Sequence, residues 1–266
     1  MPAQTGIAVA QFAPNADIEQ NERTISQLTE TAAGRGARVV VLPEYSSYFV
    51  NPMDESFAAN AQDVDGPFVA HLIALAARYD VVIVAGLLEP AEDDRVHNTV
   101  VAVDGSEVLA TYRKVHLYDA FGQKESSWVA PGEVIPPETF EVDDLRFGLM
   151  TCYDLRFPES ARVLADAAVD VALVPAEWVR GPLKEHHWRT LVTARAIENT
   201  MYVAAADHTP PIGVGNSLIV DPQGMTVASI GTSVDVAVAV ADAAAIRQVR
   251  RTNPALSLRR YRVVPR

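Results

Sequence analysis

Cysteine is almost absent from this 266-residue chain, which contains a single one, Cys152. One cysteine cannot close a disulfide within the chain, so disulfides do not hold this fold together. The sequence also lacks an apolar run of about 18 residues, the length that a membrane-spanning helix needs. The N-terminal sequence MPAQTGIAVAQF has neither the basic region nor the long apolar region of a signal peptide. We therefore expect a soluble, cytoplasmic protein whose thiol stays reduced.

Basic residues are scarce as well. Lys and Arg number 22 against 34 Asp and Glu, which gives a net charge of -12. Such a surface repels phosphate backbones, so we expect no nucleic-acid partner. The arginines that do occur gather near the end of the sequence, at positions 247, 250, 251, 259, 260, 262 and 266. Apolar residues alternate with them, and we expect the tail (about 250–266) to pack on a partner subunit.

Motifs for metals and cofactors are missing too. No glycine-rich phosphate loop, dinucleotide fingerprint, H-E-x-x-H motif or Cys/His ligand set occurs. The adjacent His186 and His187 would diverge by about 100° on a helix, which makes a shared metal difficult. We expect neither a metal nor a cofactor.

The sequence does contain many short Val- and Ile-rich runs that alternate with helical patterns, as in an α/β protein. Strands are predicted at 6–12, 39–42, 81–87, 98–103, 108–112, 147–151, 171–175, 202–206, 217–220, 227–230 and 234–240. Helices are predicted at 18–35, 67–79, 158–168, 184–199 and 243–251. No linker or internal repeat interrupts the pattern, so the simplest organisation is one domain over residues 1–266.

Cys152 lies in the segment RFGLMTCYDLRF, where an apolar strand ends and a polar turn begins. Pro158 then opens a helical pattern. A thiol at this position would feel backbone N–H dipoles, which favour the thiolate. The alternative is a buried thiol of the core, since free cysteines are often buried.

Two charged residues occupy comparable positions. Glu44 follows the strand VVVLP, and Lys114 follows the second strand of a predicted hairpin. Each could simply be exposed to solvent. Together with Cys152, however, they supply the parts of acyl transfer. The thiol would attack a carbonyl carbon, the carboxylate would move its proton, and the ammonium would stabilise the oxyanion.

The segments Pro43-Glu44, YRKVHLYD (112–119), CYDLRFPE (152–159) and ARAIENT (194–200) closely resemble the nitrilase superfamily of carbon–nitrogen hydrolases. The resemblance implies a four-layer α-β-β-α sandwich, a homodimer or higher homo-oligomer, and catalytic roles for Glu44, Lys114 and Cys152. It also implies that Glu125, in FGQKESSWVAPG, orients Lys114 and the substrate, although an exposed loop glutamate is the alternative. The backbone N–H of Tyr153 is the implied second oxyanion donor.

Two further residues could contact the substrate. The Arg156 guanidinium could bind a substrate carboxylate, or it could brace the turn through Asp154 or Glu159. Trp178 could form a wall of the pocket or pack in the core. His116 could in principle pair with Cys152 as a Cys–His dyad, but the resemblance implies a supporting role.

The motif CYDLRFPE is similar to the branch that contains ω-amidase and deaminated-glutathione amidase. We therefore predict an amidase that hydrolyses a non-peptide amide bond of a small carboxylate-bearing substrate through a thioester and releases ammonia or an amine. A nitrile hydrolase with the same Glu-Lys-Cys triad is one alternative, and a catalytically idle binding or scaffold protein is another.

Overall fold

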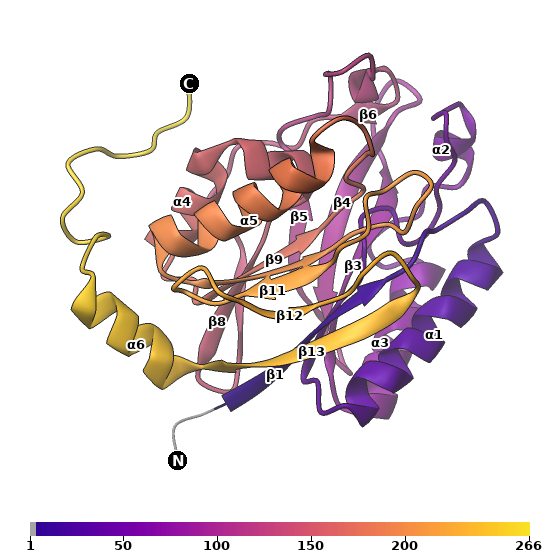
Figure 1. Ribbon diagram of the computed structural model, residues 1–266. Helices are drawn as coiled ribbons and strands as arrows, with labels where there is room; N and C mark the ends of the chain where they lie inside the picture. The colour runs from indigo at the N-terminus through magenta and orange to yellow at the C-terminus, as the bar shows by residue number, and fades with distance from the viewer. Residues whose placement is uncertain (1–3) are drawn as a thin grey trace.

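The computed structural model describes residues 4–266, and the first three residues of the predicted domain lie outside this range. The chain folds into two sheets that stack face to face, with helices on both outer faces (Figure 1). The first sheet has the order β13 (Asp235–Asp242), β1 (Gln4–Gln11), β2 (Val39–Val41), β3 (Val82–Pro90), β4 (Val96–Val103), β5 (Val108–Arg113), and β6 (Val129–Ala130) pairs with β4. The second has the order β12 (Thr226–Ser229), β11 (Leu218–Val220), β10 (Tyr202–Ala206), β9 (Val171–Pro175), β8 (Leu145–Leu149), β7 (Thr139–Val142).

Strand alternation produces the layers. In β1, Ile7 and Val9 face the core between the sheets, whereas Ala8 and Ala10 face the helices outside. Successive side chains of a strand point to opposite faces, so a strand covered on both sides is apolar throughout. This is why the central strands have continuous apolar runs rather than a clean alternation of apolar and polar residues.

The helices cover the outer faces in two pairs. Helices α1 (Ile18–Gly34) and α3 (Pro67–Tyr79) pack on the first sheet, and α4 (Pro158–Asp166) and α5 (Lys184–Asn199) pack on the second. The short α2 (Ser56–Ala59) lies in a loop, and α6 (Ala243–Thr252) follows β13. The predicted four-layer α-β-β-α sandwich is confirmed.

Helix α2 and strands β6 and β7 were not predicted from the sequence, nor were the short 3-10 helices Glu125–Ser127 and Cys152–Arg156. Strand β7 pairs with β8 across a turn at Asp143, which adopts a positive φ of 54° without being glycine. The usual Gly signal of a tight hairpin is therefore missing there. After α6, the chain runs along the outside of the sandwich (Figure 1). Arg259 pairs with Asp166 of α4, and Leu258 and Tyr261 are exposed.

No helix within residues 4–266 is both long and apolar enough to cross a membrane.

Candidate active site

The site lies at the carboxyl ends of parallel strands. Strands β1, β2 and β3 run parallel to one another, as do β8, β9 and β10. Glu44 follows β2, Cys152 follows β8, and Glu177 follows β9. Glu44 belongs to the first sheet and the other two residues to the second. The carboxyl ends of these strands lie together where the two sheets stack, and the backbone N–H of Glu177 reaches the Glu44 carboxylate there.

Cys152 opens a single turn of 3-10 helix, Cys152–Arg156, with a positive φ of 45°. A residue other than glycine is rarely held in this region unless its surroundings enforce it. The buried Asp154 does so, because its carboxylate accepts from the backbone N–H of Thr151 (3.1 Å) and from the Tyr112 hydroxyl (2.7 Å). Asp154 also contacts Nδ1 of His116 at 2.7 Å. The geometry thus places His116 behind the turn as a support.

Lys114 lies between two carboxylates. Its Nζ is 2.8 Å from Oε1 of Glu44 and 3.0 Å from both oxygens of Glu125, and all three side chains are at most 2% exposed. Burial alone would lower the pKa of Lys114, but the negative charges of Glu125 and Glu44 outweigh it and raise that pKa well above its ordinary value. Lys114 therefore remains an ammonium.

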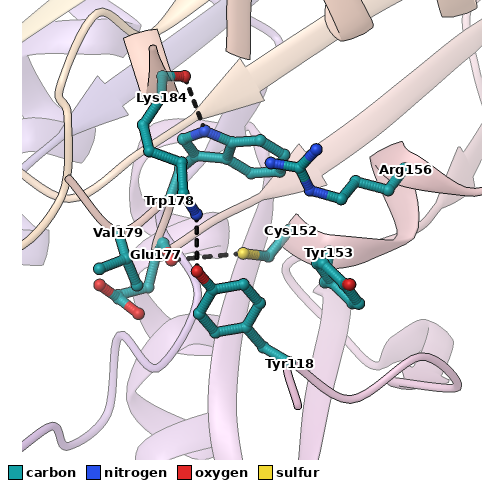
Figure 2. Close-up of a pocket in the computed structure, with 8 residues that line it drawn as sticks. All are labelled: Tyr118, Cys152, Tyr153, Arg156, Glu177, Trp178, Val179 and Lys184. Atoms are coloured by element: carbon teal, nitrogen blue, oxygen red, sulfur yellow. Dashed lines mark hydrogen bonds between the residues drawn. The ribbon is translucent and has the colours of Figure 1, made fainter. Parts of the chain in front are cut away.

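Cys152 and Glu44 both bind the backbone of Glu177. The Cys152 thiol donates to the backbone carbonyl of Glu177 (3.3 Å; Figure 2). The backbone N–H of the same residue donates to Oε2 of Glu44 (2.6 Å). The backbone of Glu177 thus holds the thiol and the carboxylate near each other.

The prediction of a thiolate is wrong for this resting state. Burial, reinforced by the negative charge of Glu44, raises the pKa of Cys152 well above its ordinary value and outweighs Lys114. The dipole argument failed because the thiol is 5% exposed and lies beside carboxylates.

Several supporting residues were missed from the sequence. Asn98 donates to Glu44 (2.6 Å) and Glu125 (3.2 Å), and the Tyr45 hydroxyl donates to Glu125 (2.5 Å). His208 contacts the Glu44 carbonyl through Nε2 (2.7 Å), and burial lowers its pKa to about 4, so the ring is neutral near pH 7. A signal existed for Asn98, which is an amide in the middle of an apolar strand.

Glu177 was also overlooked, although it follows β9 as Glu44 follows β2. Its side chain is 6% exposed, and Oε1 has no hydrogen-bond partner within residues 4–266. Burial, followed by the negative charge of Glu44, raises the pKa of Glu177 well above its ordinary value. The Glu177 carboxyl therefore keeps its proton to a higher pH than an ordinary glutamate does.

Two cavities flank this cluster. The smaller, about 10 Å³, lies at Cys152 and has room for about one water molecule. The residues around it are Tyr118, Tyr153, Arg156, Glu177, Trp178, Val179 and Lys184 (Figure 2). The larger, about 260 Å³, reaches Glu125 and Glu177 from the side of Phe49 and Trp128. The three predicted substrate-contacting residues, Tyr153, Arg156 and Trp178, thus line the cavity of the thiol.

Trp178 both packs in the core and forms a wall of the cavity. It is 3% exposed and packs against Trp188, with ring centroids 5.5 Å apart, while its face forms the cavity wall. Arg156 forms no ion pair with Asp154, Glu159 or any other carboxylate in the described part of the chain. Its guanidinium lies over the Trp178 ring, 4.9 Å from the centroid.

Residues 6–251 match the family model described as carbon-nitrogen hydrolase. The chain belongs to this family. It is 37% identical over 255 residues to a deaminated glutathione amidase of Escherichia coli O157:H7, covering 96% of this chain and 97% of the relative. Known structures agree with the fold. The NitFhit protein of C. elegans has a TM-score of 0.87 and 30% identity over 97% of this chain and 66% of that longer one. An amidase mutant from Nesterenkonia sp. in complex with acrylamide has a TM-score of 0.82 and 25% identity, covering 97% and 94% of the two chains.

The family match and the amidase relatives make this protein an amide-hydrolysing carbon–nitrogen hydrolase, as predicted from the sequence. Within residues 4–266, no three His, Cys, Asp or Glu side chains group as ligands for a metal ion.

Proposed function

We propose that this amidase hydrolyses small carboxylate-bearing amides through a thioester on Cys152. The observation that carries this proposal is the buried thiol next to the Glu44–Lys114–Glu125 cluster. Such a cluster has little structural justification, because two buried carboxylates and one ammonium are costly to desolvate. Perturbed charges gathered at a cavity are typical of an active site.

In the first half of the reaction, Oε2 of Glu44 accepts the thiol proton as Sγ bonds to the amide carbon. The ammonium of Lys114 and the backbone N–H of Tyr153 stabilise the resulting oxyanion. Glu44 then returns the proton to the amide nitrogen, the C–N bond breaks, and ammonia or an amine leaves. In the second half, Glu44 takes a proton from water, whose oxygen attacks the thioester and releases the acid and the thiol.

Glu125 has a positioning role in this scheme. Both of its oxygens hold the Lys114 ammonium at 3.0 Å, and Oε2 also accepts the backbone N–H of Tyr118 (2.5 Å). The ammonium therefore has a fixed direction before the substrate arrives, which reduces the reorganisation needed in the transition state.

Arg156 is the proposed carboxylate-binding residue. It lines the cavity of Cys152 and has no carboxylate partner among residues 4–266, so its charge is free to bind a substrate anion. The alternative, in which Arg156 braces the turn by an ion pair, has no support in these contacts.

A nitrile could be attacked by the same thiol, but the amidase relatives favour the amide. A binding or scaffold role would leave the buried charges unexplained. The test is to screen amides and matched nitriles for ammonia or amine release, with intact-protein mass spectrometry after rapid quenching. An adduct of acyl mass on Cys152 is expected. Turnover without any acyl-enzyme, under conditions in which chemistry is faster than deacylation, would contradict the mechanism.

We also propose that the enzyme is cytoplasmic and forms homodimers through its tail. The reduced thiol suits the cytoplasm. The tail exposes Leu258, Tyr261 and Val264 by 67%, 91% and 71%, a row of apolar side chains that a second copy would cover. Light scattering of the full chain, compared with a Tyr261→Ser variant, tests the dimer. A monomeric wild type would contradict it.

A further inference from the structure

Lys184 is a buried cation that no catalytic step uses. It begins helix α5, is 5% exposed, and lines the cavity of Cys152. Its Nζ donates to the Tyr118 hydroxyl (2.6 Å), as Figure 2 shows. Within residues 4–266 it forms no ion pair with a carboxylate. Burying an ammonium without an anion is unfavourable, and burial, followed by the positive charge of Arg156, lowers the pKa of Lys184.

Aromatic rings partly compensate for the missing anion. The Lys184 Nζ lies 4.2 Å from the ring centroid of Phe121 and 4.7 Å from that of Tyr118. Arg156 shares Phe121 and Trp178 with Lys184. Its guanidinium is 5.4 Å from the centroid of Phe121 and 4.9 Å from that of Trp178, and the Lys184 Nζ is 5.7 Å from the latter. Aromatic faces stabilise cations, yet they satisfy none of the free N–H groups.

Arg156 is under-satisfied in the same way. Its Nε is buried without a hydrogen-bond partner in the described part of the chain, and its Nη2 contacts Nδ1 of His187 at 3.3 Å. His187 offers no negative charge. Burial and the nearby Arg156 lower its pKa, which keeps the ring neutral. Two cations therefore share one corner of the cavity, and neither has a carboxylate partner within residues 4–266.

We propose that Lys184 is a specificity-determining residue that binds the substrate carboxylate jointly with Arg156. This inference rests on the proposed function, in which Arg156 alone was assigned to the anion. A carboxylate has two oxygens with several acceptor positions, so one can meet the guanidinium and the other the ammonium. Its arrival offsets the repulsion between the two cations, and the buried Trp178 ring in the cavity wall limits the water that competes for both contacts. Tyr118 acts as a positioning residue, because its hydroxyl aims the ammonium at the cavity.

The test uses Lys184→Met, which keeps an apolar stem of similar length, and Lys184→Arg, which keeps the charge. Kinetics are measured with succinamate, which bears a carboxylate, and with succinamide, its neutral counterpart. We expect Lys184→Met to raise KM for succinamate about tenfold or more with little change in kcat, and to leave succinamide nearly unaffected. Lys184→Arg should recover most of the loss. The matched control is Arg180→Met, which removes an exposed cation from the loop between β9 and α5, the loop that leads to Lys184.

A second measurement needs no turnover. Succinate itself should protect Cys152 from iodoacetamide in the wild type, and Lys184→Met should need about tenfold more succinate for equal protection. If amides are hydrolysed but Lys184→Met affects succinamate and succinamide equally, the role of Lys184 is refuted and the amidase mechanism stands. If no amide is turned over but protection depends on Lys184, the two-cation site stands and the proposed substrate chemistry fails. Wild-type-like protection in Lys184→Met would overturn the inference in either case.

Discussion

The backbone N–H of Glu177 donates a hydrogen bond of 2.6 Å to Oε2 of Glu44, while the carbonyl of the same residue accepts the thiol of Cys152. The carboxylate and the thiol are therefore both held by the backbone of one residue just after β9. A shift of this backbone would move both groups, which is why the strands of the second sheet matter for the chemistry as much as the side chains do.

The first prediction concerns the nucleophile. Cys152→Ala should abolish amide turnover, because no thioester can form, while the thermal unfolding midpoint changes little for so small a side chain. Cys152→Ser should also be nearly inactive, since a hydroxyl is a much weaker nucleophile at neutral pH. Ammonia release and circular dichroism measure the two effects. Residual turnover above background in the alanine variant would refute the mechanism.

The second prediction separates thiol acidity from catalysis. The negative charge of Glu44 contributes to the raised pKa of Cys152, so Glu44→Gln should lower that pKa and speed alkylation by iodoacetamide at neutral pH. The same change removes the proton acceptor, and kcat should fall about a hundredfold or more. A variant that loses both alkylation and turnover would instead indicate a damaged site.

The third prediction concerns Lys114. Removing its charge leaves Glu44 and Glu125 as unpaired buried carboxylates, so Lys114→Met should cost about 3–5 kcal/mol of unfolding free energy as well as about a hundredfold in kcat. Adding Glu125→Gln removes one of those charges. The double variant should regain stability in urea titrations without regaining activity. A double variant less stable than Lys114→Met would contradict the ion-pair account.

The fourth prediction uses pH. The pKa of Glu177 is raised above its ordinary value of 4.5, so the unfolded chain ionises first as pH rises. The stabilisation of the folded state that comes from this group is fully present below about pH 4.5. It is lost as the pH rises through the pKa that Glu177 has in the folded state. In Glu177→Gln the side chain cannot ionise, so this loss of stability does not occur. The unfolding midpoint of the variant should therefore rise relative to that of wild type between pH 5 and pH 8. The exposed Glu185→Gln serves as the control. Parallel pH profiles for wild type and Glu177→Gln would rule out a raised pKa of Glu177.

The fifth prediction concerns Arg156. Arg156→Lys keeps the charge but loses the planar fork, so KM should rise for carboxylate-bearing amides and hardly change for neutral amides of equal length. An equal loss for both substrate classes would mean that Arg156 supports the turn that carries Cys152.

Apolar runs were sufficient to predict an α/β protein, and the residues after such runs placed Glu44, Lys114 and Cys152 at strand ends. The four-layer sandwich and the membership of Glu125 in this group came from the resemblance to the nitrilase superfamily. The sequence was insufficient where the outcome depends on how two distant strands meet. The hydrogen bonds that join Cys152 and Glu44 to the backbone of Glu177 depend on how the two sheets stack. The raised pKa of Cys152 likewise depends on which carboxylates surround the thiol.

Lys184 illustrates a different limit. Its place at the start of a helix, in PLKEHHW, is typical of a solvated surface lysine. Only the fold brings Tyr118, Phe121 and Arg156 around it, from segments that lie elsewhere in the chain.

The pairing of β1 with β13 has a consequence for how the protein is made. The register runs from Gln4 opposite Asp242 to Gln11 opposite Asp235, so one edge of the first sheet is completed only by residues synthesised more than two hundred positions later. During translation, the edge of β1 that pairs with β13 therefore stays unpaired until β13 has been synthesised. We expect nascent chains that stop before β13 to aggregate or recruit chaperones, and folding to be slow because this contact is so distant along the chain.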